Sequence, residues 1–185
     1  MNKLFQYAGI AASVVLIAFG IGAVYMGIDG RARVHSDLAR EQIVGTEDST
    51  IPGQKVDTGS EAQAFAAVIR KHTLEATEGK TYAQMERFIG KDGKPTSDEK
   101  LAAINPDTGK PVENGLRNMW INATALSTAL NTAYFAESVA TFAIVMGIAL
   151  LLAGLGFAVL TFRALTPEPA RKEKRAQAMA AVPTA

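Results

Sequence analysis

Residues 138–162 read SVATFAIVMGIALLLAGLGFAVLTF and contain no Asp, Glu, Lys, Arg or His. As a helix this segment would be about 37 Å long at 1.5 Å per residue, which is enough to cross a hydrocarbon core of about 30 Å with some tilt. A second uncharged run, residues 4–28, reads LFQYAGIAASVVLIAFGIGAVYMGI. Because a bilayer offers the backbone no hydrogen-bonding partner, both segments are predicted to be transmembrane helices.

Two alternatives compete with this interpretation. Residues 4–28 follow Lys3 and contain small residues at 20–23, as a cleaved signal peptide would, but the apolar run is long for such a peptide and continues past these residues. Residues 138–162 could instead form the core helix of a soluble protein, although a run of this length without charge is unusual there. We therefore expect an integral membrane protein.

The overall composition excludes several classes of function. The 185 residues include 19 Lys or Arg and 18 Asp or Glu, and the net charge of +1 does not indicate a nucleic-acid partner. The absence of cysteine excludes disulfides, thiolate metal sites and cysteine nucleophiles. The sequence also lacks the P-loop, the GxSxG elbow and the dinucleotide-binding fingerprint.

The flanking charges predict the orientation of the two spans. Residues 163–185 form a basic tail, which favours a cytoplasmic location for this end and, with two spans, for residues 1–3 as well. We expect this tail to be disordered; it either binds anionic lipid or serves only as a topology signal. Arg31 and its neighbours favour the opposite orientation, but a segment as long as residues 29–137 usually crosses regardless of charge. The prediction is a plasma-membrane protein whose residues 29–137 are extracytoplasmic.

Small residues recur on both predicted spans. Gly147 and Gly154 share one position of a seven-residue repeat, and Gly22 is one of several small residues spaced four apart on the first span. Small residues let helix backbones approach closely in lipid, so this pattern favours either a tight hairpin of the two spans or a homodimer through Gly147, Gly154 and Gly22. The alternative is that Gly and Ala are simply common in membrane helices.

Residues 29–59 are expected to be partly irregular, because turn-forming residues collect at 45–53. Residues 60–137 are expected to be helical. Ser60 with Gln63 has the form of a capping box. The predicted helices of this part cover residues 60–78, 81–89 and 98–104. Thr81 is the expected N-terminal cap of the second of these helices, and Ser97 that of the third.

A longer helix is expected after these short ones. Apolar residues follow a helical period from Leu116, and no Gly or Pro interrupts the segment before Gly147, so one helix should continue into the second span. Trp120 on this helix is expected in the core of the outer domain. The loops at 91–95 and 107–111 are predicted to be β-turns with glycine at the tight position. The predicted fold class is all-α: a two-span helical hairpin with a small extracytoplasmic helical domain between the spans.

The sequence offers few candidates for a chemical site. His72 and Glu75 lie at i and i+3 of one predicted helix face, and His35 is the other histidine of the chain. A metal site needs three or four ligands, so these residues are weak candidates, and the alternative is a solvated polar face. We expect no catalytic residue, no metal and no cofactor.

The chain resembles an uncharacterised family of actinobacterial two-span membrane proteins. The resemblance covers most of the chain and depends on residues 1–4 with the first span, and on the stretches 37–46, 72–77, 81–85, 109–115 and 129–137. Proteins of this kind are often labelled automatically as aromatic ring-opening dioxygenases, which implies a membrane-anchored, metal-dependent oxygenase. Such an enzyme holds iron with two histidines and a carboxylate, and would have to use both His35 and His72.

From the residues themselves we expect a non-catalytic membrane protein, an accessory or binding subunit of a cell-envelope assembly. Its expected partners are the lipid bilayer and other membrane proteins or a second copy of the chain. The metal-dependent oxygenase is the alternative. A channel or transporter is a third class, but the spans contain no ionisable residue for an ion pathway.

Overall fold

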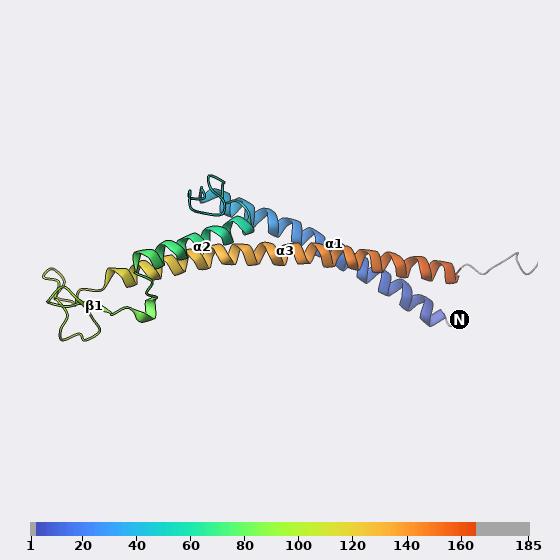
Figure 1. Cartoon of the computed structure of the whole chain (residues 1–185). Coiled ribbons are helices and arrows are strands. Elements are labelled where there is room, and N and C mark those ends of the chain that lie inside the picture. Colours follow the sequence, from blue (N-terminus) through green and yellow to red (C-terminus); the bar gives the residue numbers. More distant parts are fainter. Residues whose placement is uncertain (1–2, 166–185) are drawn as a thin grey trace, which may run out of the picture. The chain divides into compact units, whose positions relative to one another are not determined.

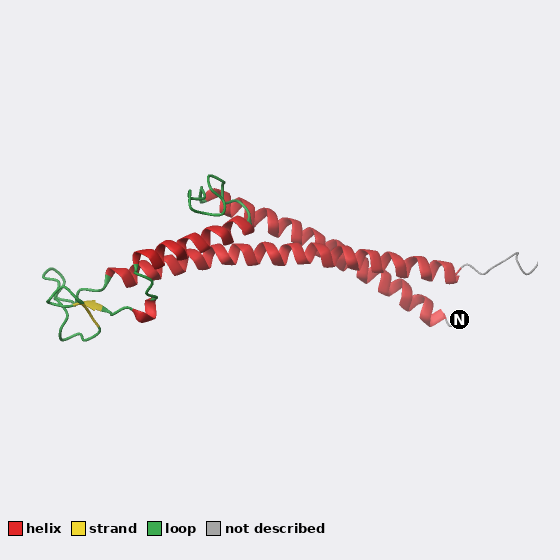
Figure 2. Cartoon of the chain, in the orientation of Figure 1, coloured by secondary structure: helices red, strands yellow, loops and turns green. Residues whose placement is uncertain are grey.

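The computed structural model describes residues 3–165, and side chains within residues 7–162 (Figure 1). The described part is mostly helical, as expected (Figure 2). Its elements in chain order are α1 (Lys3–Arg40), α2 (Gly59–Ala76), the 3₁₀ helix η1 (Tyr82–Gln84), β1 (Phe88–Ile89), β2 (Pro95–Thr96) and α3 (Gly115–Leu165).

The chain divides into two compact units, and α1 and α3 each contribute residues to both of them. One, the hairpin unit, comprises Met1–Gly27 and Phe142–Ala185. The other, the head, comprises Ile28–Thr141. Both α1 and α3 are long and apolar enough to cross a membrane, and only 11% of the most apolar window of each is buried. A core helix of a soluble protein would be mostly buried, so the outward-facing apolar side chains favour lipid as the surroundings.

Within the hairpin unit α1 and α3 run antiparallel in close contact. A Cβ added to Gly147 would lie 2.8 Å from the carbonyl oxygen of Gly20, and one added to Gly154 would lie 3.1 Å from the carbonyl oxygen of Ser13. Real Cβ atoms do not approach backbone oxygen at the shorter distance, so a side chain at Gly147 requires the helices to move. The predicted hairpin packing of Gly147 and Gly154 is therefore present. Gly22 differs, because nothing lies within 4 Å of a Cβ added there.

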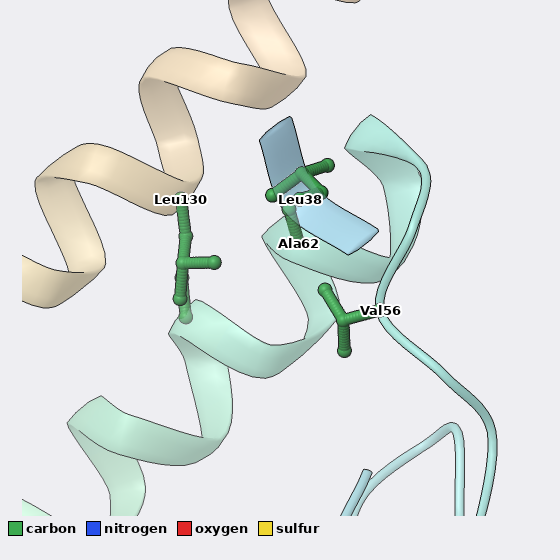
Figure 3. Close-up of a cluster of buried hydrophobic side chains, with 5 residues drawn as sticks. Leu38, Val56, Ala62 and Leu130 are labelled. Atoms are coloured by element: carbon green, nitrogen blue, oxygen red, sulfur yellow. The ribbon is translucent and has the colours of Figure 1, made fainter. Parts of the chain in front are cut away.

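The core of the head lies where α1, α2 and α3 meet (Figure 3). Leu38 comes from the last turn of α1, Val56 from the following loop, Ala62 from α2 and Leu130 from α3. Val56 is 1% exposed and Ala62 is 0% exposed. The small Ala62 side chain lets α2 lie close to its neighbours, so the head has a compact core although its helices are few.

The start of α2 is determined by Thr58, not by Ser60 as the sequence pattern suggested. The Thr58 hydroxyl accepts a hydrogen bond from the backbone N–H of Glu61 at 3.4 Å. The Glu61 carboxylate accepts in return from the backbone N–H groups of Thr58 (2.9 Å) and Asp57 (3.0 Å). The capping box is thus present two residues earlier than predicted, because the pair Thr58/Glu61 has the same spacing as Ser60/Gln63.

The segment between α2 and α3 contradicts two predicted helices. Residues 81–89 form only the turn η1 and then the strand β1, which pairs antiparallel with β2. Residues 98–104 are not helical either: the Asp98 carboxylate accepts from the backbone N–H of Lys100 at 2.9 Å, which closes a local turn. The expectation that all of residues 60–137 are helical is therefore wrong for this segment.

The two predicted glycine turns explain why strands replace helices here. Gly93 has φ +77° and Gly109 has φ +65°, conformations that glycine adopts without strain. The turn at Gly93 lets the backbone N–H of Gly90 donate to the carbonyl of Lys94 at 2.7 Å. Because such turns reverse the chain at short intervals, the flanking residues pair as short strands. The prediction of β-turns at residues 91–95 and 107–111 is confirmed.

The long helix predicted from Leu116 is confirmed as α3, which has 51 residues. The Asn114 side chain accepts from the backbone N–H of Leu116 at 3.1 Å and caps its first turn. Trp120 is 6% exposed, as predicted for a core residue, and its Nε1–H donates to the carbonyl of Lys80 at 2.9 Å. The predicted tail lies largely in residues 166–185, outside the described residues.

Candidate functional site

The carboxylate of Glu137 on α3 has partners on both of the other helices of the head. Its Oε1 accepts hydrogen bonds from Arg31 Nε (2.8 Å) and from His35 Nε2 (2.9 Å), both on α1. Its Oε2 accepts from the backbone N–H of Gly59, the first residue of α2. One carboxylate therefore joins all three helices of the head, immediately before the predicted second span.

The electrostatic environment of Glu137 favours the ionised form. Its side chain is only 12% exposed, and burial works to raise its pKa. Hydrogen bonds from His35, Gly59 and Arg31 work in the opposite direction and hold the pKa below its usual value. The position at the beginning of α2 adds the favourable interaction of an anion with a helix N-terminus. These contacts describe a structural junction between the three helices.

A second polar cluster surrounds Asp48 in the loop after α1. Asp48 Oδ2 accepts from Lys71 Nζ at 2.7 Å and contacts His72 Nε2 at 2.8 Å. Hydrogen bonds from Lys71, His72 and Thr46 hold the pKa of Asp48 far below its usual value, and the pKa of Lys71 is raised by the same contact. The cluster is solvent-exposed and joins the loop to α2.

The weak metal candidates have different partners. His35 contacts Glu137, while His72 contacts Asp48. Glu75 lies 4.0 Å from Lys71 through its Oε1. Among the described residues, no group of three or more His, Asp or Glu side chains is arranged to hold a metal ion. The arrangement that the oxygenase alternative needs is thus not formed by His35, His72 and Glu75.

The head also carries an open apolar groove of about 600 Å³. Its lining comes from α1, the loop that follows α1, α2 and α3, and most of it is aliphatic or aromatic. Its large apolar side chains are those of Val34, Leu38, Ile43, Phe65, Ile69, Leu126 and Leu130. Leu126 is 58% exposed, so the described chain leaves this side chain uncovered, whereas Leu38 and Leu130 are each 6% exposed and belong to the core of the head. Asp37 and Glu41 add carboxylates on the α1 side of the groove.

Sequence reasoning missed the importance of Glu137, Arg31 and Asp48. Glu137 was merely the residue before an uncharged run, and Asp48 one of several acidic loop residues. Glu137 lies 106 positions from Arg31, so only the tertiary arrangement brings them together. Nothing in the local sequence around either residue identifies this pair.

Comparisons of this chain with protein-family models, curated proteins and solved structures found no match in any of the three. The interpretation of its function therefore depends on its own residues.

Proposed function

We propose that this chain is a non-catalytic, two-span membrane protein that serves as an accessory or binding subunit of a cell-envelope assembly. The observation that carries the proposal is the apolar groove of the head, about 600 Å³ in volume and open along three helices. The polar side chains that could have formed a reactive centre, Glu137 and Asp48, are occupied by partners that join the helices and the loop.

The occupant that best suits the groove is a helix of a partner protein. Apolar side chains at Leu126, Leu130 and Ala133 follow the spacing of one helix face, which is the pattern of helix-in-groove recognition. A fourth helix would also complete a bundle with α1, α2 and α3. Glu41 lines the groove and has no ion pair among the described residues, so a partner helix with Lys or Arg beside its apolar stripe is complementary in charge.

We further propose that the protein resides in the plasma membrane, with cytoplasmic termini and residues 29–137 outside. The length and exposure of the apolar parts of α1 and α3 support two spans, and the basic residues after position 162 support this orientation. The resemblance to actinobacterial two-span proteins is consistent with this proposal.

Site-specific photo-cross-linking in native membranes tests the partner helix. A photoreactive amino acid replaces Leu126 in the groove, and the matched control replaces Ala125, which is exposed on the same turn but does not line the groove. We expect a discrete adduct from position 126 whose attached peptide is an amphipathic helix with basic residues. Leu126→Asp should abolish co-purification of that protein. Equal labelling from position 125, or an adduct with a second copy of this chain, would contradict the proposal.

The topology has an independent test, because the chain contains no cysteine. Single substitutions Lys110→Cys and Lys172→Cys are labelled with a membrane-impermeant maleimide. We expect labelling of Lys110→Cys in intact cells and of Lys172→Cys only after lysis. The reverse pattern would place the head in the cytoplasm.

A further inference from the structure

A second groove, of about 320 Å³, lies on the head between α2 and α3. Small side chains at Ala66, Ala67 and Ala123 line it, and the Trp120 side chain lines it as well. Because the alanine side chains are small, they leave open the space between the two helices that forms the groove. The volume is at the lower end of the range for small-molecule sites.

The remaining lining residues are polar and come from both helices. Gln63 and Arg70 are seven residues apart on α2, and so lie on one face of it. Thr124, Thr128 and Asn131 follow spacings of four and three on α3. The groove therefore has a row of hydrogen-bonding groups on each side.

These five side chains are exposed, whereas Ser127, which also lines the groove, donates a hydrogen bond to the carbonyl of Ala66 at 3.5 Å. Within the part of the chain whose side chains are described, those of Gln63, Arg70, Thr124, Thr128 and Asn131 form no hydrogen bond or ion pair. The contrast with the next residues on α2 is direct, since Lys71 and His72 both contact Asp48. The guanidinium of Arg70 lies 5.7 Å from the centre of the Trp120 ring, which places its charge at the groove.

We propose that this groove binds an acidic sugar. The planar guanidinium of Arg70 suits a carboxylate, which it can hold with two parallel hydrogen bonds. The amides of Gln63 and Asn131 and the hydroxyls of Thr124 and Thr128 can donate and accept, which a ligand with many hydroxyl groups requires. The alanine side chains and Trp120 offer apolar contact to the C–H groups of a sugar ring. This site is separate from the apolar groove and does not depend on the proposed partner helix.

The fluorescence of Trp120, the single tryptophan of the chain, can be used to measure ligand binding in this groove. Trp120 lines the groove beneath Arg70, so a carboxylate that binds Arg70 changes the surroundings of the indole ring. The full chain in detergent micelles is titrated with D-glucuronate while Trp120 fluorescence is recorded. D-Glucose, acetate and N-acetylalanine serve as a neutral sugar, a bare anion and a peptide-like carboxylate. We expect a saturable response to glucuronate with a dissociation constant of about 1 mM, and at least about tenfold weaker responses to the other three.

Two variants separate binding at this groove from general effects. Arg70→Gln should weaken glucuronate binding by about tenfold or more, because it removes the charged donor. Lys71→Gln removes a neighbouring positive charge that contacts Asp48, and should leave the titration unchanged. Saturation-transfer NMR on the same samples reports binding without relying on fluorescence.

The proposal is overturned if glucuronate gives no saturable signal by either method. It is also overturned if acetate or N-acetylalanine binds as tightly as glucuronate, which would indicate an anion or peptide site. Equal loss of binding in Lys71→Gln and Arg70→Gln would likewise exclude the groove, because it would show attraction by net charge alone.

Discussion

The carboxylate of Glu137 accepts a hydrogen bond from the backbone N–H of Gly59, which lies 78 positions earlier and begins α2. The other oxygen of the same carboxylate contacts Arg31 and His35 on α1. A single side chain thereby fixes the beginning of α2 against the two long helices. Because Gly59 is buried and a Cβ added there would lie 2.9 Å from the Cα of Tyr134, the chain has little room to find another arrangement.

Replacing Glu137 by Gln should destabilise the head by about 1–3 kcal/mol, because it removes an ionised acceptor from partners that remain in place. The measurement is chemical unfolding in detergent, followed through Trp120, the only tryptophan of the chain. Glu47→Gln is the matched control, since Glu47 is exposed and has no ion pair among the described residues. Equal stability of Glu137→Gln and Glu47→Gln would show that the junction contributes nothing.

The lowered pKa of Glu137 predicts a dependence of stability on pH. A carboxyl group whose folded-state pKa lies below its unfolded value of 4.5 stabilises the fold at higher pH. This contribution is complete above the unfolded value and is lost as the pH falls through 4.5 toward the folded-state pKa. Unfolding measured at intervals between pH 7 and pH 3 should therefore show a smaller loss in Glu137→Gln than in the wild type. Parallel curves for the two proteins would contradict the assignment.

The capping residue of α2 can be identified by two substitutions. Thr58→Ala should destabilise the head by about 1 kcal/mol, because it removes the acceptor for the Glu61 backbone N–H. Ser60→Ala should have almost no effect, since Ser60 is exposed and its hydroxyl contacts only that of Thr58 among the described residues. The same unfolding measurement checks both. A larger effect at Ser60 would restore the cap that sequence spacing alone suggested.

The helices α1 and α3 could be predicted because the sequence features that indicate them lie within the helices themselves. Uncharged runs at residues 4–28 and 138–162 and the uninterrupted period after Leu116 indicate long helices without knowledge of the rest of the chain. The cap of α2 was misplaced by two residues because Thr58 and Ser60 both precede a suitable residue at the same spacing. Local patterns of this kind identify the element but not its first residue.

The strands and the polar junction could not be predicted in the same way. Phe88 pairs with Thr96 and also bridges to Glu113, so the strand depends on two other segments. The alternation of apolar and polar residues around Phe88 is too short to distinguish a strand from a turn of helix. Glu137 likewise acquires its role only when α1 and α3 are antiparallel in the register that brings Arg31 beside it. The glycine turns at Gly93 and Gly109 were predictable because the required conformation belongs to the residue itself.

The last prediction concerns the glycines of the hairpin unit. Gly147→Ala should destabilise the pairing of α1 and α3 by about 1–3 kcal/mol, because its Cβ would lie 2.8 Å from the backbone of Gly20 and Val24. Gly22→Ala should be tolerated, since nothing lies within 4 Å of its Cβ. Helix content is followed by circular dichroism during titration with a denaturing detergent, and the molecular mass of the complex is measured in a mild one.

The same pair of variants separates hairpin packing from a homodimer. Gly147 is already occupied by contacts within the chain, whereas Gly22 is open to a second copy. A purely intramolecular hairpin is weakened by Gly147→Ala and keeps its mass in Gly22→Ala. If Gly22→Ala instead converts a dimer to a monomer, the first span contributes a face to self-association. Equal stability of Gly147→Ala and Gly22→Ala would contradict the close approach of α1 and α3 at that point.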